Sequence, residues 1–187
     1  MGKLIYSAHV SLDGYTKDAA GNFDFTAPDE EVHEFVNDQE RSVGTYLFGR
    51  RMYETMAVWE TWDTTLEPRA VRDFATIWSR ARKVVYSQAL HSVGTRMTTI
   101  EREFIPDEVR ALKDASAEDL GIGGATIAGV ALRAGLIDEV RLYVSPIIVG
   151  SGLSALPDDV RLDLTLLEER RFTAGTVYLR YQVKPGL

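Results

Sequence analysis

Twice in this chain, a short apolar segment ends at glycine or a glycine-rich turn and leads directly into a segment with helical spacing. In the first case apolar residues 46–48 precede Gly49 and a helical pattern over 50–58; in the second, a strand pattern at 120–122 precedes a helical pattern over 125–134. A strand that passes straight into a helix begins a right-handed βαβ crossover, which makes successive strands parallel. These junctions predict an α/β fold whose ligands bind beyond the carboxyl ends of the strands.

The other patterns extend this fold along the chain. Strands are predicted at residues 3–10, 83–86, 98–100 and 140–149, and helices at about 28–42, at 67–79 and from Pro106 onward. The apolar face of the first helix is expected to comprise Val32, Phe35, Val36 and Val43. Residues 162–171 and 176–183, on either side of a turn at 173–175, predict an antiparallel hairpin. We therefore expect one domain over residues 1–187, with a mainly parallel central sheet, flanking helices and a C-terminal antiparallel hairpin.

The composition of the chain excludes several kinds of functional site. The chain has no cysteine, which excludes disulfides, thiolate catalysis and cysteine-ligated zinc or iron–sulfur sites, and its three scattered histidines do not favour a metal site. A formal charge of −7 argues against a general nucleic-acid binder, which needs a basic face. No apolar run is long enough to span a bilayer, and residues 1–6 lead into a strand pattern instead of a secretory signal, so we expect a cytoplasmic location. Redox chemistry would need a dissociable organic cofactor.

The second glycine turn is the most informative segment. Gly121, Gly123 and Gly124 leave a strand pattern and open a helix, in which Ala125 and Thr126 come first. Backbone N–H groups at such a helix start bind pyrophosphate, and glycine lets the ligand approach the main chain. Glycine also permits a tight strand-to-helix turn without any ligand, and the spacing alone does not decide between the two. The G-x-G-x-x-G fingerprint of dinucleotide-binding folds is not met, because Thr126 stands at its third glycine.

The first glycine turn carries positive charge. Arg50 and Arg51 directly follow Gly49, and the planar guanidinium group suits phosphate. A 2′-phosphate on adenosine would account for both the charge and its position. The alternative is that both arginines are solvated surface charges, with Glu54 as an i,i+4 or i,i+3 partner. Two phosphate-suited turns in one parallel sheet favour the first interpretation.

These motifs occur in the order seen in the dihydrofolate-reductase-like superfamily. They comprise Leu4-Ile5-Tyr6-Ser7 with Ser11-Leu12-Asp13-Gly14, Gly49-Arg50-Arg51-Met52-Tyr53-Glu54, Val85-Tyr86-Ser87, Gly123-Gly124-Ala125 and Gly135-Leu136-Ile137-Asp138-Glu139. More narrowly, the chain resembles the reductase domain of bifunctional riboflavin-biosynthesis deaminase-reductases and their free-standing bacterial relatives, over residues 3–183. The zinc motif of the deaminase half does not occur in this sequence, so the resemblance does not imply the riboflavin pathway.

The resemblance implies an NADPH site at the strand ends. Three groups of residues would hold the cofactor: Gly49, Arg50, Arg51 and Met52 beside the adenosine phosphates, Ser87 and Gln88 at the 2′-phosphate and adenine side, and Ile122, Gly123, Gly124, Ala125 and Thr126 at the pyrophosphate. Ala8 would lie on the nicotinamide and substrate side. His9 would lie there too, although a half-buried strand position accounts for it better.

Three residues are candidates for a catalytic role under this resemblance: Ser11, Asp13 and Glu31. Ser11 and Asp13 belong to the turn on the nicotinamide and substrate side. Glu31 is the nearest match to the acidic residue that true dihydrofolate reductases place on their first helix, and it would serve as a proton donor or substrate anchor. The helix macrodipole also favours an acid in a first turn, which gives Glu31 a structural alternative. The aromatic candidates for the walls of a flat substrate site, or for simple packing, are Phe23, Phe25, Trp59 and Trp62.

Together these features predict an NADPH-dependent reductase that passes a hydride to a small, flat, nitrogen-containing substrate. The resemblance implies an aminouracil ribosyl phosphate-like or pterin-like compound. Two other functions stay open: a non-catalytic nucleotide- or flavin-binding protein of the same fold, and an interaction protein that pairs through its hairpin. The resemblance also implies a homodimer formed on the side of the hairpin, whose apolar strands would otherwise lie at a bare sheet edge.

Overall fold

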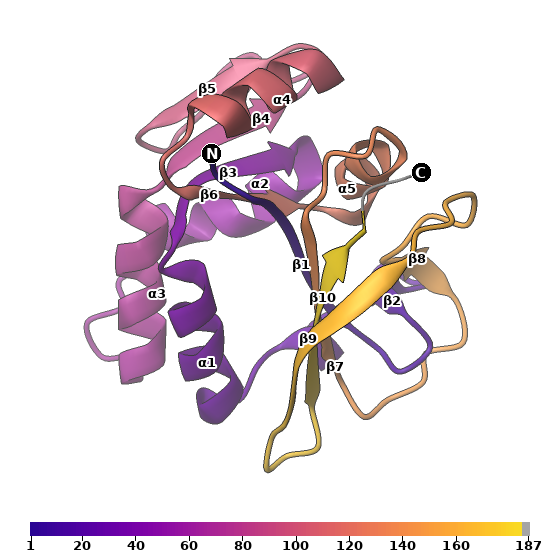
Figure 1. Cartoon of the computed structure of the whole chain (residues 1–187). Helices are drawn as coiled ribbons and strands as arrows, with labels where there is room; N and C mark the ends of the chain where they lie inside the picture. The colour runs from indigo at the N-terminus through magenta and orange to yellow at the C-terminus, as the bar shows by residue number, and fades with distance from the viewer. Residues whose placement is uncertain (185–187) are drawn as a thin grey trace.

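The computed structural model describes residues 1–184, which form an eight-stranded sheet and a separate two-stranded sheet (Figure 1). The strands are β1 (Leu4–Val10), β2 (Tyr15–Asp18), β3 (Val43–Gly49), β4 (Arg82–Tyr86), β5 (Thr98–Glu101), β6 (Asp119–Gly123), β7 (Glu139–Val144), β8 (Gly152–Ser154), β9 (Leu164–Arg171) and β10 (Val177–Val183). The order in the large sheet is β5-β4-β3-β6-β1-β7-β10-β9. Every neighbouring pair from β5 to β7 is parallel, whereas β10 runs antiparallel to both β7 and β9. The predicted mainly parallel sheet with a C-terminal antiparallel hairpin is confirmed.

Helices cover both faces of the large sheet. They are α1 (Glu30–Glu40), α2 (Arg50–Met56), α3 (Arg69–Arg80), α4 (Pro106–Ala115) and α5 (Ala125–Arg133), with short 3₁₀ turns at Asp24–Thr26 and Ala57–Glu60. Successive side chains of β3 point to opposite faces of the sheet and pack against the helices on each face. Leu47 packs in a core cluster with Ile127 of α5, whereas the Tyr46 ring on the other face stacks 5.9 Å from the ring of Trp78 in α3. Within residues 1–184, no helix is long and apolar enough to span a bilayer.

Local signals set the helix ends. The Asp29 carboxylate accepts a 2.8 Å hydrogen bond from the Val32 N–H and so caps α1. Pro106 is the first residue of α4, where its missing N–H costs nothing. Gly135 follows α5 with a φ of 63°, the left-handed conformation expected of a glycine at the C′ position.

The structure corrects two predicted segments and adds one strand pairing that the sequence did not predict. Val43 does not belong to the apolar face of α1 but begins β3, because the helix ends at Glu40 and the chain turns there. The strand expected over 140–149 ends at Val144, since Pro146 has no N–H to continue the ladder. The pairing of β2 with β8 has no counterpart among the predicted strands. Both strands are short, and they come together only because the loops after β1 and β7 meet.

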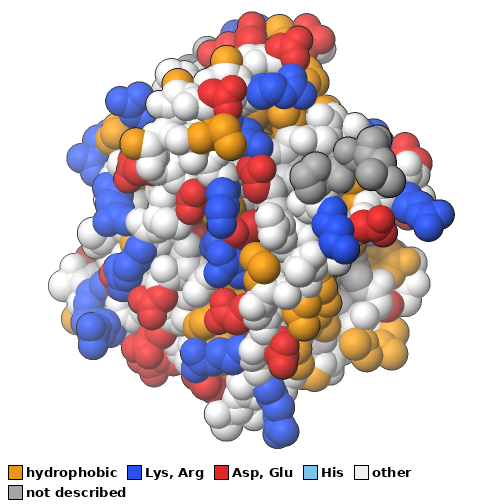
Figure 2. All heavy atoms as spheres, in the orientation of Figure 1, with side chains coloured by type: hydrophobic (Ala, Val, Ile, Leu, Met, Phe, Trp, Pro, Cys, Tyr) orange, Lys and Arg blue, Asp and Glu red, His pale blue; other side chains and the backbone are white. Residues whose placement is uncertain are grey.

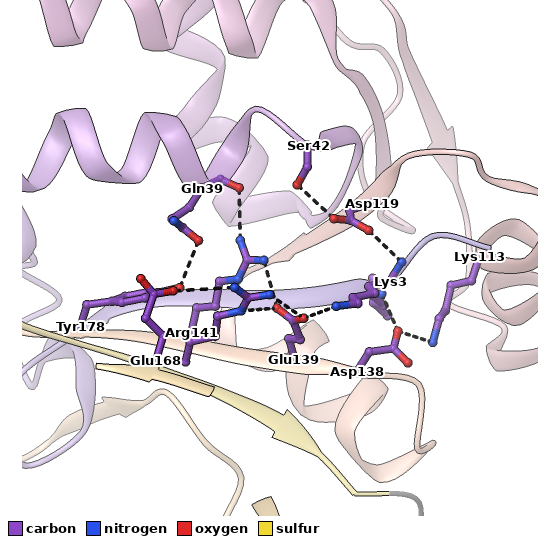
Figure 3. Close-up of polar contacts among 12 residues, drawn as sticks. Lys3, Gln39, Ser42, Lys113, Asp119, Asp138, Glu139, Arg141, Glu168 and Tyr178 are labelled. Carbon is purple, nitrogen blue, oxygen red and sulfur yellow. Dashed lines mark hydrogen bonds and ion pairs between the residues drawn. The ribbon is translucent and has the colours of Figure 1, made fainter. Parts of the chain in front are cut away.

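An ionic network around the buried Glu139 carboxylate joins the amino ends of β1 and β7 to β10 (Figure 3). The Glu139 carboxylate at the start of β7 lies 2.6 Å from Lys3 Nζ, 3.0 Å from Arg141 Nη2 and 2.8 Å from Arg180 Nε. Burial by itself raises the pKa of Glu139, but hydrogen bonds from Arg180, Lys3 and Arg141 outweigh it and hold that pKa at about 2. The network therefore stabilises the end of the sheet opposite the carboxyl ends of the parallel strands.

Candidate functional site

The carboxyl ends of the parallel strands lie together at one end of the sheet. In the register, Gly49 of β3 pairs with Tyr86 of β4, which pairs with Glu101 of β5, while Phe48 pairs with Gly123 of β6. The turns that follow these four adjacent strands therefore lie side by side. The candidate site consists of these turns together with those after β1 and β7.

Glycines shape the turn between β6 and α5, and each has a structural reason to be there. A Cβ on Gly123 would lie 2.5 Å from the Phe48 ring, so no side chain fits. Gly124 has a φ of 103°, which favours glycine, and as the N-cap residue of α5 it has no side chain to cap the helix. The positive end of the α5 dipole is thus open to an anion. The geometry is compatible with both interpretations of this turn, tight packing and pyrophosphate binding.

The other residues predicted at the pyrophosphate differ in what a ligand can reach. Ile122 is buried in the core, Ala125 is half-buried, and Thr126 is exposed in the first turn of α5. Ala125 and Thr126 also line an open groove of about 350 Å³, whose other wall includes β8 and the segment that follows it. A ligand can therefore reach the backbone and side chain of Thr126, but not the side chain of Ile122.

The turn after β3 touches the glycine turn through Met52. A Cβ on Gly124 would lie 3.3 Å from Met52 Cβ, which places the two turns in contact. Arg50 Nη1 lies 2.9 Å from Glu54 Oε1 in an i,i+4 ion pair, and both side chains are nearly half exposed. Arg51 is exposed as well. The ion pair of the alternative interpretation is therefore present, and both guanidinium groups are still accessible to a phosphate.

Ser87 and Gln88 follow β4 in a tight turn. Ser87 is buried, and its Oγ accepts hydrogen bonds from the N–H groups of Ala89 at 3.3 Å and Leu90 at 3.0 Å, while Gln88 is exposed. Arg102, which the sequence interpretation missed, donates from Nη1 to the carbonyl oxygens of Ser87 at 3.1 Å and Leu90 at 2.7 Å. A signal for it was available, because this arginine comes two residues after the strand predicted at 98–100.

The turn after β1 is bound to the loop after β7. Asp13, which is exposed, accepts hydrogen bonds from the N–H groups of Val149 at 3.2 Å and Gly150 at 2.7 Å. A hydrogen bond from the Ser11 hydroxyl, together with these backbone bonds, lowers the pKa of Asp13, so its carboxylate is ionised at neutral pH. Ser11 is fully buried, and its Oγ accepts a 3.0 Å hydrogen bond from the Tyr15 N–H. Both predicted residues thus hold this turn in shape.

Glu31 connects α1 to the terminal hairpin. Its Oε2 accepts a 2.9 Å hydrogen bond from the Thr173 N–H, and its Oε1 lies 3.5 Å from Arg170 Nη2. The bond from Thr173 and the nearby arginine lower the pKa of Glu31. An ionised carboxylate is a poor proton donor, so these contacts favour the structural alternative, and the catalytic role stays a prediction. Among residues 1–184, no hydrogen bond or ion pair joins Glu31 to Ser11 or Asp13.

Ala8 and His9, near the carboxyl end of β1, lie at the same end of the sheet. Ala8 is buried in the core, so a ligand could meet only its backbone. His9 is half-buried, as predicted, and its ring stacks on that of Tyr143 with centroids 4.5 Å apart. Burial and, to a smaller extent, the neighbouring His33 lower the pKa of His9 to about 4, so its imidazole is neutral at neutral pH.

Of the four aromatic candidates for the substrate walls, Trp59 and Trp62 pack against each other. The Trp59 ring packs against Phe74 of α3 with centroids 4.7 Å apart, and Trp62 lies 5.2 Å from Trp59. Lys17 Nζ lies 4.8 Å above the Phe23 ring, and within residues 1–184 no ring–ring contact joins Phe23 or Phe25 to Trp59 or Trp62. These contacts favour the packing interpretation for Trp59.

The sequence matches the family model described as the RibD C-terminal domain over residues 2–178. This chain belongs to the RibD C-terminal domain family. Another protein similar to this RibD C-terminal domain is the uncharacterized protein YyaP of Bacillus subtilis (strain 168). The two are 26% identical over 184 residues, which cover 96% of this chain and 94% of YyaP.

Two solved structures share the fold of this RibD C-terminal domain. A Shewanella sp. PV-4 protein named for riboflavin biosynthesis superposes with a TM-score of 0.75 at 20% identity, over 98% of this chain and 99% of that one. A Thermotoga maritima protein named diaminohydroxyphosphoribosylaminopyrimidine deaminase/5-amino-6-(5-phosphoribosylamino)uracil reductase superposes with a TM-score of 0.67 at 16% identity. That match covers 98% of this chain and 57% of the Thermotoga chain. The family match and these neighbours confirm the predicted dihydrofolate-reductase-like fold.

Proposed function

We propose that this chain is an NADPH-dependent reductase that transfers a hydride to a small, flat, nitrogen-containing heterocycle. The strongest support is that the turns after β3, β4, β5 and β6 lie together at the carboxyl end of the sheet. Accessible arginines lie there beside the start of α5, which has no side-chain cap. Membership of the RibD C-terminal domain family supports the same function, since a solved relative of this fold is named a reductase.

The residues at the carboxyl end of the sheet have the chemistry needed to bind NADPH. Gly123 and Gly124 present bare backbone, and the N–H groups at the start of α5, from Ala125 and Thr126 onward, suit a pyrophosphate. Arg50 and Arg51 suit the phosphates of the adenosine half, because a guanidinium group makes charge-assisted hydrogen bonds to phosphate. The remaining proposed contacts are the backbone of Ala8 and Ile122, the Gly49 and Met52 turn that carries the arginines, and the turn formed by Ser87 and Gln88.

Bound NADPH would supply the hydride from its nicotinamide. The chain's own residues would hold the cofactor, orient the substrate beside it and exclude water. On the nicotinamide and substrate side we place the turn formed by Ser11 and Asp13, with Glu31 as a further anchor. Because the pKa values of Asp13 and Glu31 are both lowered, an ordered water is a better source of the proton for the reduced substrate than either carboxyl group.

The proposed substrate is aminouracil ribosyl phosphate-like or pterin-like. In support, the Thermotoga relative is named for a 5-amino-6-(5-phosphoribosylamino)uracil reductase, although this chain spans little more than half of that protein. The neutral His9 ring, stacked on Tyr143, offers the kind of flat surface on which a heterocycle packs.

We also propose that residues 1–187 form one domain and that this domain forms a homodimer through β9. One sheet contains both β1 and β10, from the two ends of the described chain. β9 is an edge strand, and Leu164, Leu166 and Leu167 on it are exposed. Figure 2 shows hydrophobic side chains in this region among interspersed positive and negative ones. A second copy would cover this edge; a cytoplasmic location stays a prediction.

The test of the reductase function is NADPH oxidation, followed by the loss of nicotinamide absorbance, over a panel of pterins, aminouracil ribosyl phosphates and related flat heterocycles. Substrate-dependent oxidation with one class of compound, absent in a Thr126→Glu variant, is the expected result. Bound NADPH that no compound oxidises would instead favour a non-catalytic nucleotide-binding protein. Failure to bind either NADPH or NADH would overturn the proposal.

A further inference from the structure

The two sides of the candidate site differ in charge. On the proposed cofactor side, the accessible Arg50 and Arg51 directly follow β3. The proposed substrate side is built largely by residues 8–38, which run from the end of β1 through β2 into α1. These residues include eight aspartates and glutamates but one lysine and no arginine, a formal charge of −7. The whole chain has the same charge, so its acidic excess lies in this one segment.

The two carboxyl groups proposed for the substrate side are ionised. Asp13 accepts two backbone hydrogen bonds from the loop after β7, and Glu31 accepts one from the Thr173 N–H. Hydrogen bonds lower the pKa of both groups, so both are charged at neutral pH. Glu30 and Glu34 add exposed carboxylates on α1. A phosphate in contact with this side would be repelled by these charges, because salt screens them only beyond about 8 Å.

Lys17 and Arg170, which border this side, already contact other groups. Lys17 Nζ lies 4.8 Å from the centroid of the Phe23 ring. Arg170 Nη2 lies 3.5 Å from Glu31 Oε1, and the Arg170 guanidinium group lies 4.8 Å from the centroid of the Phe172 ring. A phosphate bound by Arg170 would have to displace the Glu31 carboxylate. For both cations, a phosphate would therefore compete with a contact that the folded chain already makes.

The ring near the end of β1 is flat and uncharged. His9 is half-buried and stacks on Tyr143 with ring centroids 4.5 Å apart and planes 11° apart. Burial and, to a smaller extent, the neighbouring His33 lower the pKa of His9 to about 4. Burial also lowers the pKa of His33, by more than the Asp73 carboxylate raises it. Both imidazoles are neutral at neutral pH, so they can exchange hydrogen bonds with a heterocycle but offer no charge to a phosphate.

We propose that the substrate is a flat heterocycle, uncharged or positively charged, that carries no phosphate group. The inference rests on the proposed function, because it presumes a reductase whose substrate lies at the end of β1. It narrows the substrate class, since a ribosyl phosphate would bring a charge of about −2 to the acidic side of the site. A neutral heterocycle would stack on His9 without that repulsion, and the same carboxylates would attract a protonated ring nitrogen.

The experiment compares one heterocycle with and without a phosphate. An aminouracil riboside and its 5′-phosphate are offered to the wild type at saturating NADPH, and kcat/KM is measured from the loss of nicotinamide absorbance. We expect kcat/KM for the riboside to exceed that for its phosphate by at least about tenfold. Raising the ionic strength from about 0.05 to 0.5 M should increase the value for the phosphate and leave that for the riboside unchanged, because salt screens the repulsion.

Two charge-reversing variants test where the repulsion comes from. Glu30→Lys places a cation in the first turn of α1, and we expect it to raise kcat/KM for the phosphate about two- to fivefold with the riboside unchanged. Glu108→Lys is the matched control, since Glu108 is likewise exposed in the first turn of a helix, but that helix is α4. It changes the net charge equally and should affect neither compound. Circular dichroism checks the fold of both variants.

The outcomes separate this inference from the proposed function. An equal or higher kcat/KM for the phosphate, or an effect of Glu108→Lys as large as that of Glu30→Lys, would overturn this inference alone. If another heterocycle is the one that is reduced, the riboside and its phosphate are compared as inhibitors of that reaction, and stronger inhibition by the phosphate would overturn the inference in the same way. Bound NADPH that no compound oxidises would overturn the proposed function and this inference with it.

Discussion

The Asp13 carboxylate accepts a 2.7 Å hydrogen bond from the N–H of Gly150, a residue 137 positions further along the chain. A second bond comes from the Val149 N–H at 3.2 Å. The two bonds fasten the turn after β1 to the loop after β7, and β2 pairs with β8 directly beyond them. The nicotinamide and substrate side of the candidate site therefore depends on this small unit as well as on the large sheet.

Replacing Asp13 with alanine removes both acceptors at once. We expect the free energy of unfolding to fall only slightly, because the freed N–H groups can bond to water instead. Amide hydrogen exchange at Val149 and Gly150 should become faster, because these bonds no longer protect them. Urea titration and exchange measurements check both effects. Unchanged protection at the two amides would show that Asp13 does not anchor the loop.

Arg50→Ala should weaken NADPH binding by roughly 1.5–3 kcal/mol and leave NADH binding unchanged, if Arg50 makes a charge-assisted bond to a phosphate that only NADPH carries. Glu54→Ala is the matched variant. Because the exposed Arg50–Glu54 pair is worth roughly 0–1 kcal/mol, its loss should leave NADPH binding unchanged or slightly tighter. Titration of both cofactors measures this. Equal affinities for NADPH and NADH in every variant would overturn the assignment of Arg50 to this phosphate.

Thr126→Glu tests the glycine turn without straining it. A carboxylate in the first turn of α5 favours the helix, yet it would repel a pyrophosphate, so we expect NADPH binding to fall by at least about tenfold in a stable protein. Val130→Glu, exposed one turn further along α5, is the control. Gly124→Val is a poorer test, because a φ of 103° would strain valine with or without a ligand. Equal Kd values for the two glutamate variants would return the turn to a purely structural role.

Glu139→Gln should lower the free energy of unfolding by about 3 kcal/mol, because it leaves the buried Arg141 guanidinium without its carboxylate partner. Glu168, half-exposed and 3.7 Å from Arg180, is the control, and Glu168→Gln should cost at most about 1 kcal/mol. Urea unfolding of the two variants compares these costs. Similar losses would mean that the network in Figure 3 contributes no more than surface ion pairs do.

The same carboxylate makes stability depend on pH. Since folding lowers the pKa of Glu139 from 4.5 to about 2, its contribution is fully present above pH 4.5 and is lost as pH falls toward 2. The stability of the wild type should therefore decline through this window more steeply than that of Glu139→Gln. Urea titrations at a series of pH values measure the difference, and parallel curves would contradict the prediction.

Light scattering over a concentration series tests the homodimer. Leu166, which is 47% exposed on β9, should lie in the interface, so Leu166→Lys should shift the protein toward the monomer. The turns after β3, β4 and β5 lie toward the other edge of the sheet, so cofactor binding should survive the substitution. A wild type that remains monomeric at high micromolar concentration would reject the dimer.

Much of the fold can be predicted from the sequence because its elements are set by near neighbours in the chain. The passage from apolar residues through Gly49 into a helix is a local signal, as are Pro106 at the start of α4 and Gly135 beyond α5. Periodicity also distinguishes the terminal hairpin from the parallel strands. Where several residues compete for one boundary, as at Val43, the local pattern does not decide which element takes them.

The candidate site is only partly determined by the sequence. The two glycine turns carry local signals, so the sequence alone marks Arg50 and Gly124 as candidates. Only the tertiary structure places Arg102 against the Ser87 turn, 15 residues away, and joins Glu31 to the N–H of Thr173, 142 residues away. Such contacts depend on which strands become neighbours in the sheet, and strand order is settled by the packing of the whole chain instead of by the spacing of residues along it.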